Sequence, residues 1–171
     1  MKIKLSITLF LFLVAYCLSS GQTMYENSRF KFKAPIPEDW RFHQEKTDSL
    51  NFTIVAWGLP KVYSEIEKQE VENAVSITAL KNRTIKSIDD VINAEFRRTK
   101  NMLIMNRVKI DSIEHTCYIT NTISGTTSYI SQQYFMLKNG IGYIITFTAT
   151  LGTYEINMFK FEEFYKTVII E

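Results

Sequence analysis

The chain is poor in the residues that cross-link or interrupt a fold. It has 2 cysteines, 3 prolines, 6 glycines and 2 histidines among 171 residues. Cys17 lies in an N-terminal apolar stretch, so a chain that loses this stretch keeps only Cys117 and has no internal disulfide. With 12 Phe and 9 Tyr, the composition excludes a low-complexity tether and predicts an ordered globule stabilised by its core.

The chain also lacks an excess of charge of one sign. It has 20 Lys and Arg against 18 Asp and Glu, and Lys2 and Lys4 belong to the first 21 residues, which leaves 18 of each sign. Nucleic acids and anionic membranes usually bind proteins with a basic excess on one face or tail. The charge balance therefore predicts that neither is a partner.

The first 21 residues have the pattern of a secretory signal peptide. Residues 1–4 form a short basic head, residues 5–18 are mostly apolar, and residues 19–21 are small. A helix needs about 20 apolar residues to cross a bilayer, and this run is shorter. We therefore expect an exported protein, periplasmic or secreted, with no transmembrane segment in its mature form.

Cys17 offers an alternative, in which the protein is a lipoprotein anchored through this residue. The segment Val14-Ala15-Tyr16-Cys17 has the outline of a lipid attachment signal. Such signals place a small residue directly before the cysteine, and Tyr16 is large. We therefore favour cleavage over anchoring, although a lipidated Cys17 would change a soluble protein into an anchored one.

Removal of the signal leaves 150 of the 171 residues, a length that fits one domain. Residues 22–28 are polar and predict a flexible leader, and residues 29–171 form the expected single domain. Residues 61–73 have a mixed pattern that fits a short surface helix or an irregular excursion. Runs rich in β-branched and aromatic residues predict strands at 30–34, 50–57, 74–80, 109–123 (broken near Glu114 and His115), 129–137 and 141–150.

Two segments have helical spacing. Ser87 is a candidate N-cap with Asp90 three residues later, and the apolar positions that follow predict a helix ending near residues 101–106. Its Arg97-Arg98-Lys100 cluster fits a solvated helix face or a partner-docking patch. Residues 158–169 predict a second, shorter helix. Because short turns join the last strands, these strands must be antiparallel, and the predicted class is α+β, a central antiparallel sheet with helices packed on its faces.

The segment Phe30 to Trp40, with its Pro37-Glu38-Asp39-Trp40 turn, resembles the opening of the PsbP/DcrB-like group, which includes photosystem II extrinsic proteins and bacterial exported proteins. The capped helix after Ser87, the strand 142–149 and the closing Phe161-Glu162-Glu163-Phe164 are similar to later landmarks of that group. The resemblance covers about residues 29–171 and rests on packing motifs. It implies a sheet with helices on both faces and an accessory or partner-binding role.

Reactive groups are too few to predict a catalytic centre. His43 and His115 are the only imidazoles, and no Gly-x-Ser-x-Gly turn is present for a serine nucleophile. Cys117 and His115 could meet on one side of a strand, but a buried apolar thiol is the simpler interpretation. Asp111, Glu114 and His115 are too sparse for a metal site. We predict no enzyme, no metal and no cofactor.

The hypothesis is therefore a non-catalytic exported domain that binds another component of the cell envelope, through its sheet face or through residues 61–73. The alternative is a small-ligand carrier with a pocket between sheet and helices. Aromatic side chains would line that pocket, and alternating hydroxyls would form the binding face of the sheet. The candidate residues are Trp40, Trp57, Tyr143, Tyr118, Thr120 and Thr122.

Overall fold

The structure is a computed structural model that describes residues 23–48, 51–111 and 116–171. The predicted signal peptide, Cys17 and His115 lie outside the described residues. The predictions that concern them therefore stay predictions.

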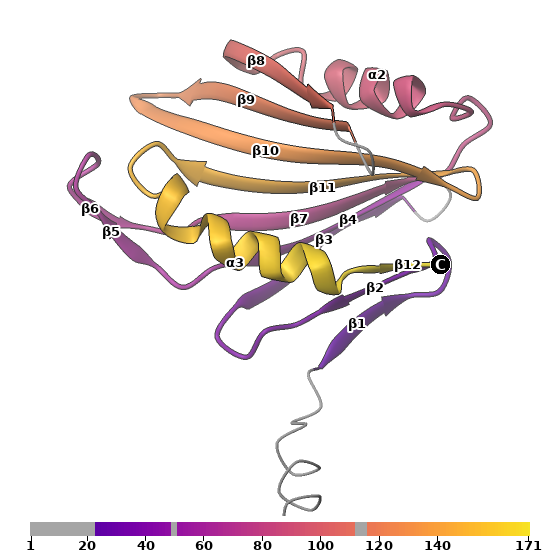
Figure 1. The fold of residues 1–171 in the computed structure, drawn as a ribbon, viewed down its shortest axis with the longest axis horizontal. Helices are drawn as coiled ribbons and strands as arrows, with labels where there is room; N and C mark the ends of the chain where they lie inside the picture. The colour runs from indigo at the N-terminus through magenta and orange to yellow at the C-terminus, as the bar shows by residue number, and fades with distance from the viewer. Residues whose placement is uncertain (1–22, 49–50, 112–115) are drawn as a thin grey trace, which may run out of the picture.

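Seven strands form one antiparallel sheet in the order β3-β4-β7-β11-β10-β9-β8 (Figure 1). The predicted α+β class is confirmed. Gly125 turns β9 into β10, and Asn139 with Gly140 turns β10 into β11, all with positive φ as these tight connections require. The strands are β3 (Arg41–Asp48), β4 (Phe52–Gly58), β7 (Ala74–Leu80), β8 (Leu103–Asp111), β9 (Thr116–Ser124), β10 (Thr127–Lys138) and β11 (Ile141–Thr150).

A second, three-stranded sheet contains both ends of the described chain. It has the order β1 (Met24–Asn27), β2 (Phe32–Pro35) and β12 (Ile169–Ile170). The prediction of a flexible leader is therefore wrong for β1. The physical reason is that Tyr25 places its ring 5.8 Å from Phe32 and 5.2 Å from Phe42, so this polar segment has one aromatic anchor in the core.

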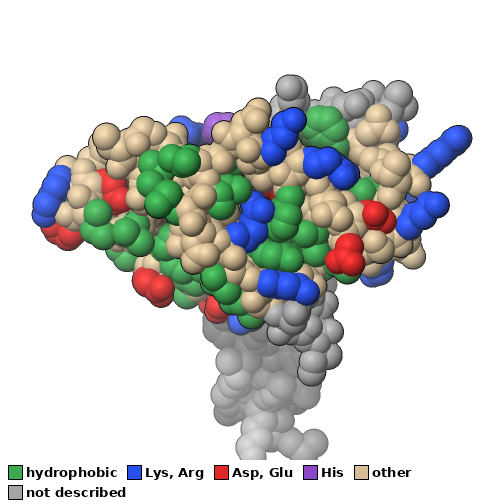
Figure 2. Space-filling view, turned by 90° about the horizontal axis from the view of Figure 1, so that it is seen from above, with side chains coloured by type: hydrophobic (Ala, Val, Ile, Leu, Met, Phe, Trp, Pro, Cys, Tyr) green, Lys and Arg blue, Asp and Glu red, His purple; other side chains and the backbone are tan. Residues whose placement is uncertain are grey.

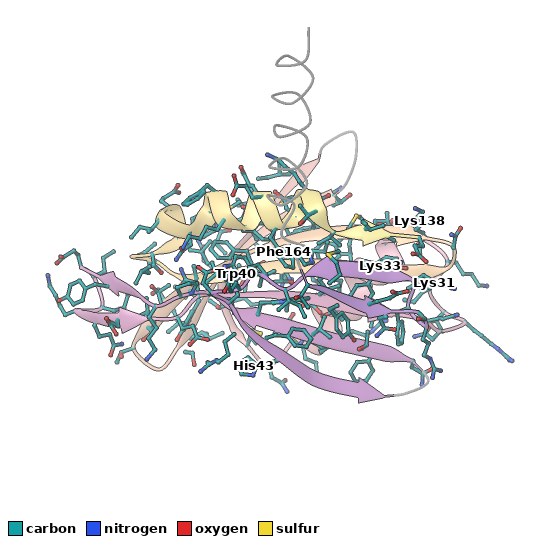
Figure 3. The ribbon with its side chains drawn as sticks, turned by 90° about the horizontal axis from the view of Figure 1, so that it is seen from below. Lys31, Lys33, Trp40, His43, Lys138 and Phe164 are labelled. Atoms are coloured by element: carbon teal, nitrogen blue, oxygen red, sulfur yellow. The ribbon has the colours of Figure 1, made fainter. Side chains whose placement is uncertain are left out.

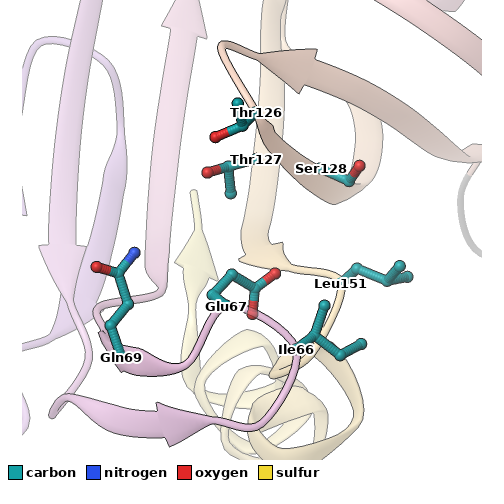
Figure 4. Close-up of a pocket in the computed structure, with 7 residues that line it drawn as sticks. All are labelled: Ile66, Glu67, Gln69, Thr126, Thr127, Ser128 and Leu151. Carbon is teal, nitrogen blue, oxygen red and sulfur yellow. The ribbon is translucent and has the colours of Figure 1, made fainter.

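Residues 61–73, whose pattern fitted either a short surface helix or an irregular excursion, contain a small hairpin. Its strands are β5 (Val62–Ser64) and β6 (Gln69–Val71). Lys68 adopts a positive φ of 53° before β6. The hairpin projects at one end of the main sheet, beside the turn from β9 to β10 (Figures 1 and 4).

Helix α2 (Ile88–Arg98) begins where the sequence predicted. Ser87 Oγ accepts the Asp90 N–H at 3.2 Å, and Asp90 Oδ2 accepts the Ser87 N–H at 2.9 Å, which is a complete capping box. The predicted end at residues 101–106 is wrong, because the chain leaves the helix at Thr99 and Leu103 already begins β8. Helix α3 (Tyr154–Thr167) starts four residues before the predicted Met158.

The two helices pack on opposite faces of the main sheet. Alternate residues of β11 point to opposite sides, so Tyr143 and Ile145 enter one core cluster while Ile144 enters the other. The first cluster includes Phe161 of α3, and the second includes Val91 of α2. In Figure 1, α3 crosses the centre of its face and leaves the β8 end of the sheet beyond it.

Candidate partner-binding site at the β8 edge

Strand β8 is the last strand of the main sheet and exposes large apolar side chains. Leu103 is 60% exposed, Met105 63%, Val108 48% and Ile110 46%. Monomeric proteins usually shorten, charge or cover such an edge, because its outward backbone N–H and C=O groups can pair with another strand. We refer to strand β8, with its exposed side chains and its outward backbone groups, as the β8 edge.

Three of the four apolar side chains of the β8 edge, those of Leu103, Val108 and Ile110, lie on the face that carries α3 elsewhere. Val108 is paired with Ile119 and Ile110 with Cys117, so each pair shares a face. The opposite face holds Lys109, which is paired with Tyr118. Figure 2, which looks at the molecule from above Figure 1, shows hydrophobic patches between Lys and Arg side chains.

The α2 face beside the β8 edge contains a charged network. Glu95 is only 2% exposed, and its two carboxylate oxygens accept hydrogen bonds from Arg98 Nε and Nη2, each at 2.7 Å. Gln133 Nε2 donates to the same carboxylate at 3.0 Å and ties α2 to β10. Arg107 lies 3.6 Å from the centre of the Phe96 ring, and burial lowers the pKa of its guanidinium.

The aromatic side chains predicted to line a ligand pocket lie in the core. Trp57 and Tyr143 are 0% exposed, and the Tyr143 hydroxyl donates to the Phe30 carbonyl at 2.8 Å. Burial raises the pKa of Tyr143 to about 12. Trp40 stacks on Phe164 of α3 at 5.3 Å, and Figure 3 shows these two side chains beside α3. The predicted pocket therefore does not form around Trp57 and Tyr143, because protein atoms cover both rings.

Two of the three residues of the predicted binding face on β9 are buried. Thr120 and Thr122 are buried, and Arg107 Nε of the neighbouring strand donates to Thr120 Oγ1 at 3.2 Å. Tyr118 is half-buried, with its ring 5.2 Å from Phe96 of α2. Side chains of β8 and α2 therefore cover the face that the sequence pattern assigned to solvent or to a partner.

Two open hollows lie elsewhere on the surface. A groove of about 440 Å³ runs between the turn before β3 and α3, where Trp40 and Phe159 form part of its wall. A second hollow of about 290 Å³ separates the β5–β6 hairpin from the β9–β10 turn (Figure 4). The second hollow is lined by Ile66, Glu67, Gln69, Thr126, Thr127, Ser128 and Leu151.

Glu67 is the only charged group among the residues lining the second hollow. Its Oε2 accepts hydrogen bonds from the hydroxyls of Ser64 and Thr150, the latter at 3.2 Å. Behind it, Thr150 contacts Thr153 at 2.9 Å, and Thr153 donates to Asn73 Oδ1 at 2.9 Å. This buried polar network orients the carboxylate, which can accept further hydrogen bonds from a donor in the hollow.

The groups considered for catalysis are not brought together in the described part of the chain. His43 is exposed on β3, away from Trp40 and Phe164 in Figure 3. Cys117 is buried, and desolvation raises the pKa of its thiol to about 11, which disfavours the reactive thiolate. Within residues 23–48, 51–111 and 116–171, no cluster of three His, Cys, Asp or Glu side chains could hold a metal ion.

No helix among the described residues has the length and apolar character needed to cross a membrane.

No protein-family model and no curated protein matches the chain. Solved structures do share its fold. Cyanobacterial PsbP (CyanoP) from a Synechocystis species is 10% identical with a TM-score of 0.52, and the alignment covers 87% of this chain and 92% of that one. The Ran-binding protein Mog1p of Saccharomyces cerevisiae is 7% identical with a TM-score of 0.54, over 89% of this chain and 96% of its own.

A third similar structure, from Bacteroides thetaiotaomicron, is 16% identical with a TM-score of 0.52, and the match covers 88% of this chain but 48% of that one. The chain is thus an α+β protein whose main sheet lies between two helices. Within that class it has the PsbP-like fold, which confirms the resemblance read from the sequence. At such low identity the likeness extends to the fold and not to an activity.

Proposed function

We propose that this protein is a non-catalytic accessory domain that acts outside the cytoplasm and binds another component of the cell envelope through the β8 edge. The observation that supports this proposal best is the nine-residue strand β8 at the edge of the main sheet, with its four exposed apolar side chains. Large exposed apolar patches mark interaction surfaces in soluble proteins. The signal-like N-terminus supports the location, and the PsbP-like fold is compatible with an accessory role.

Affinity capture from the envelope of the producing organism tests the proposal. The bait is the mature domain, compared with a Val108→Lys/Ile110→Lys variant. An Ile156→Lys/Phe159→Lys variant is the matched control, since these two side chains of α3 are exposed to a similar degree, 50% and 57%. We expect the wild type and the control to recover the same proteins, and the β8 variant to lose them. Recovery no greater than that of bare matrix, or unaffected by the β8 variant, contradicts the proposal.

A small-ligand carrier is the second candidate, and the observation that favours it is the hollow at Glu67. Its hydroxyls, amide and carboxylate converge beside the aliphatic Ile66 and Leu151, as in sites for small polar molecules. The test is two-dimensional NMR of the domain with a panel of polyols and primary amines, using Glu67→Gln as the control. Shift changes confined to the hollow and lost in Glu67→Gln support the carrier, whereas an unperturbed hollow contradicts it.

A further inference from the structure

The segment that ends α2 and forms β8 has a charge pattern unlike the rest of the chain. From Arg97 to Ile110 the sequence contains five basic residues and no acidic one, although the whole chain has 20 basic and 18 acidic residues. Two acidic residues flank this segment: Asp111 ends β8 directly after Ile110, and Glu95 is buried and bound to Arg98. Residues 95–111 together have five basic and two acidic side chains, which is an excess of three positive charges.

The fold brings this positive charge next to the β8 edge. Arg97 and Lys100 are exposed at the end of α2, and the turn through Met102 leads directly into β8, with the Met102 N–H donating to the Thr99 carbonyl at 3.0 Å. On β8 itself, Arg107 packs on Phe96 of the same helix. The end of α2 and the face of β8 that holds Arg107 and Lys109 therefore lie on the same side of the sheet, and we refer to them as the basic surface.

The backbone of β8 supplies a second feature. An antiparallel strand uses the N–H and C=O groups of alternate residues toward each neighbour, and β8 has a neighbour, β9, on one side. Among the described residues no strand pairs with its other side, and the regular pairing with β9 is interrupted only by a register shift between Ile104 and Asn106. An extended peptide can therefore add to the sheet at this edge, with its side chains alternating between the two faces.

We infer that the partner contributes an extended segment in which acidic and apolar side chains alternate, and that this segment adds to the sheet beside β8. Its apolar side chains contact Leu103, Val108 and Ile110 on one face, and its carboxylates face the basic surface on the other. This inference rests on the proposed function and names the chemistry of the partner. An acidic peptide fits better than an anionic membrane, because a strand edge offers backbone pairing that lipids cannot use.

A library of random nine-residue peptides displayed on phage tests the inference with the mature domain as target. We expect selected peptides to alternate Asp or Glu with Val, Ile or Phe. Synthetic versions should bind Arg97→Glu/Lys100→Glu about tenfold more weakly than wild type, since each exposed charge pair contributes up to about 1 kcal/mol. Lys61→Glu/Lys81→Glu is the control, because both lysines are exposed and distant from β8 in the fold: Lys61 directly precedes β5, and Lys81 directly follows β7, which is four places from β8 in the sheet.

The outcomes separate this inference from the proposed function. The inference is overturned if the selected peptides are neutral or basic, or if they bind both charge-reversed variants equally well. The proposed function is then still tested separately by the affinity-capture experiment. Flotation with vesicles containing 30% phosphatidylglycerol is the second arm, in which about a third of the lipid is anionic. Vesicle binding that is lost in Arg97→Glu/Lys100→Glu, with no acidic peptides selected, also overturns it and assigns the basic surface to a membrane.

Discussion

On the α3 face of the main sheet, stacked aromatic rings fill the space between helix and strands, whereas the α2 face has a smaller hydrophobic cluster beside the buried carboxylate of Glu95. Phe161 of α3 stacks on Phe147 at 5.3 Å and on Tyr134 at 5.5 Å. The α2 face instead relies on Val91, Ile92 and the Glu95 network. We infer from this difference that the α3 face contributes most of the stability of the fold, and that the end of α2 is available for partner binding.

The largest expected effect concerns the α3 face. Replacing Phe161 by Ala should lower the free energy of unfolding by about 3–5 kcal/mol, because a fully buried ring leaves a cavity among its stacked neighbours. Urea denaturation followed by circular dichroism measures the change. Phe159→Ala on the same helix is the control, since Phe159 is 57% exposed and should change stability by about 0.5 kcal/mol or less. Equal losses in the two variants would contradict the described core.

The contact of α2 with the sheet provides the next test. A Cβ on Gly142 would lie 2.5 Å from Val91 Cγ2, so Gly142→Ala should cost about 1–3 kcal/mol through overpacking. The same substitution in a Val91→Ala background should cost less, because the obstructing methyl groups are gone. A double-mutant cycle by urea denaturation measures the difference. Purely additive costs would mean that α2 packs less closely on β11 than described.

The buried Glu95 carboxylate on the α2 face should contribute moderately to the free energy of unfolding. Glu95→Ala removes the acceptor of Gln133 and Arg98, and leaving the buried Gln133 amide without this partner should cost about 1–3 kcal/mol. Arg98 is half-exposed, so water can solvate its freed guanidinium. Arg97→Ala, two residues from Glu95 and exposed, is the control. A loss no larger than that of Arg97→Ala would show that the network does not stabilise the α2 face.

The smallest expected effect is at the start of α2, where Ser87→Ala should lower the free energy of unfolding by about 1 kcal/mol.

The same helix start has a pH dependence. The N–H of Lys86, followed by the hydroxyl and N–H of Ser87, lowers the pKa of Asp90 from its usual 3.8. A lowered folded-state pKa stabilises the protein above the unfolded-state value and loses this contribution as pH falls through the folded-state value. The stability gap between wild type and Asp90→Asn should therefore shrink below about pH 4. Unfolding curves from pH 2 to 7 check this, and a pH-independent gap would argue against the capping box.

Elements with strong local signals were predicted well. The bounds of β7 and β11 are confirmed, because both strands are buried on two faces and are rich in β-branched and aromatic residues. The start of α2 is confirmed because a capping box is a contact between near neighbours in sequence. Its end was wrong by several residues, since Leu103 fits helical spacing as well as it fits the strand that it begins.

Elements defined by distant contacts were missed. Strand β3 is largely polar, and only its pairing with β4 identifies it as a strand. The candidate site was anticipated in part, because the Arg97-Arg98-Lys100 cluster was one of the proposed docking patches. The alternation of Val108 and Ile110 with Arg107 and Lys109 was present in the sequence. Its place at an uncovered edge depends on strand order, which no local pattern reports.

The amino-acid sequence by itself determined the class of the fold, the main strands and the first turn of α2, because side-chain periodicity and capping act over a few residues. Only the tertiary structure decided that Trp57 and Tyr143 are covered, that Thr120 lies beneath Arg107, and that β8 has no strand on its outer side among the described residues. Burial and edge position arise from contacts between segments far apart in the chain. A local pattern of residues is therefore compatible with a buried or an exposed side chain, and with a central or an edge strand.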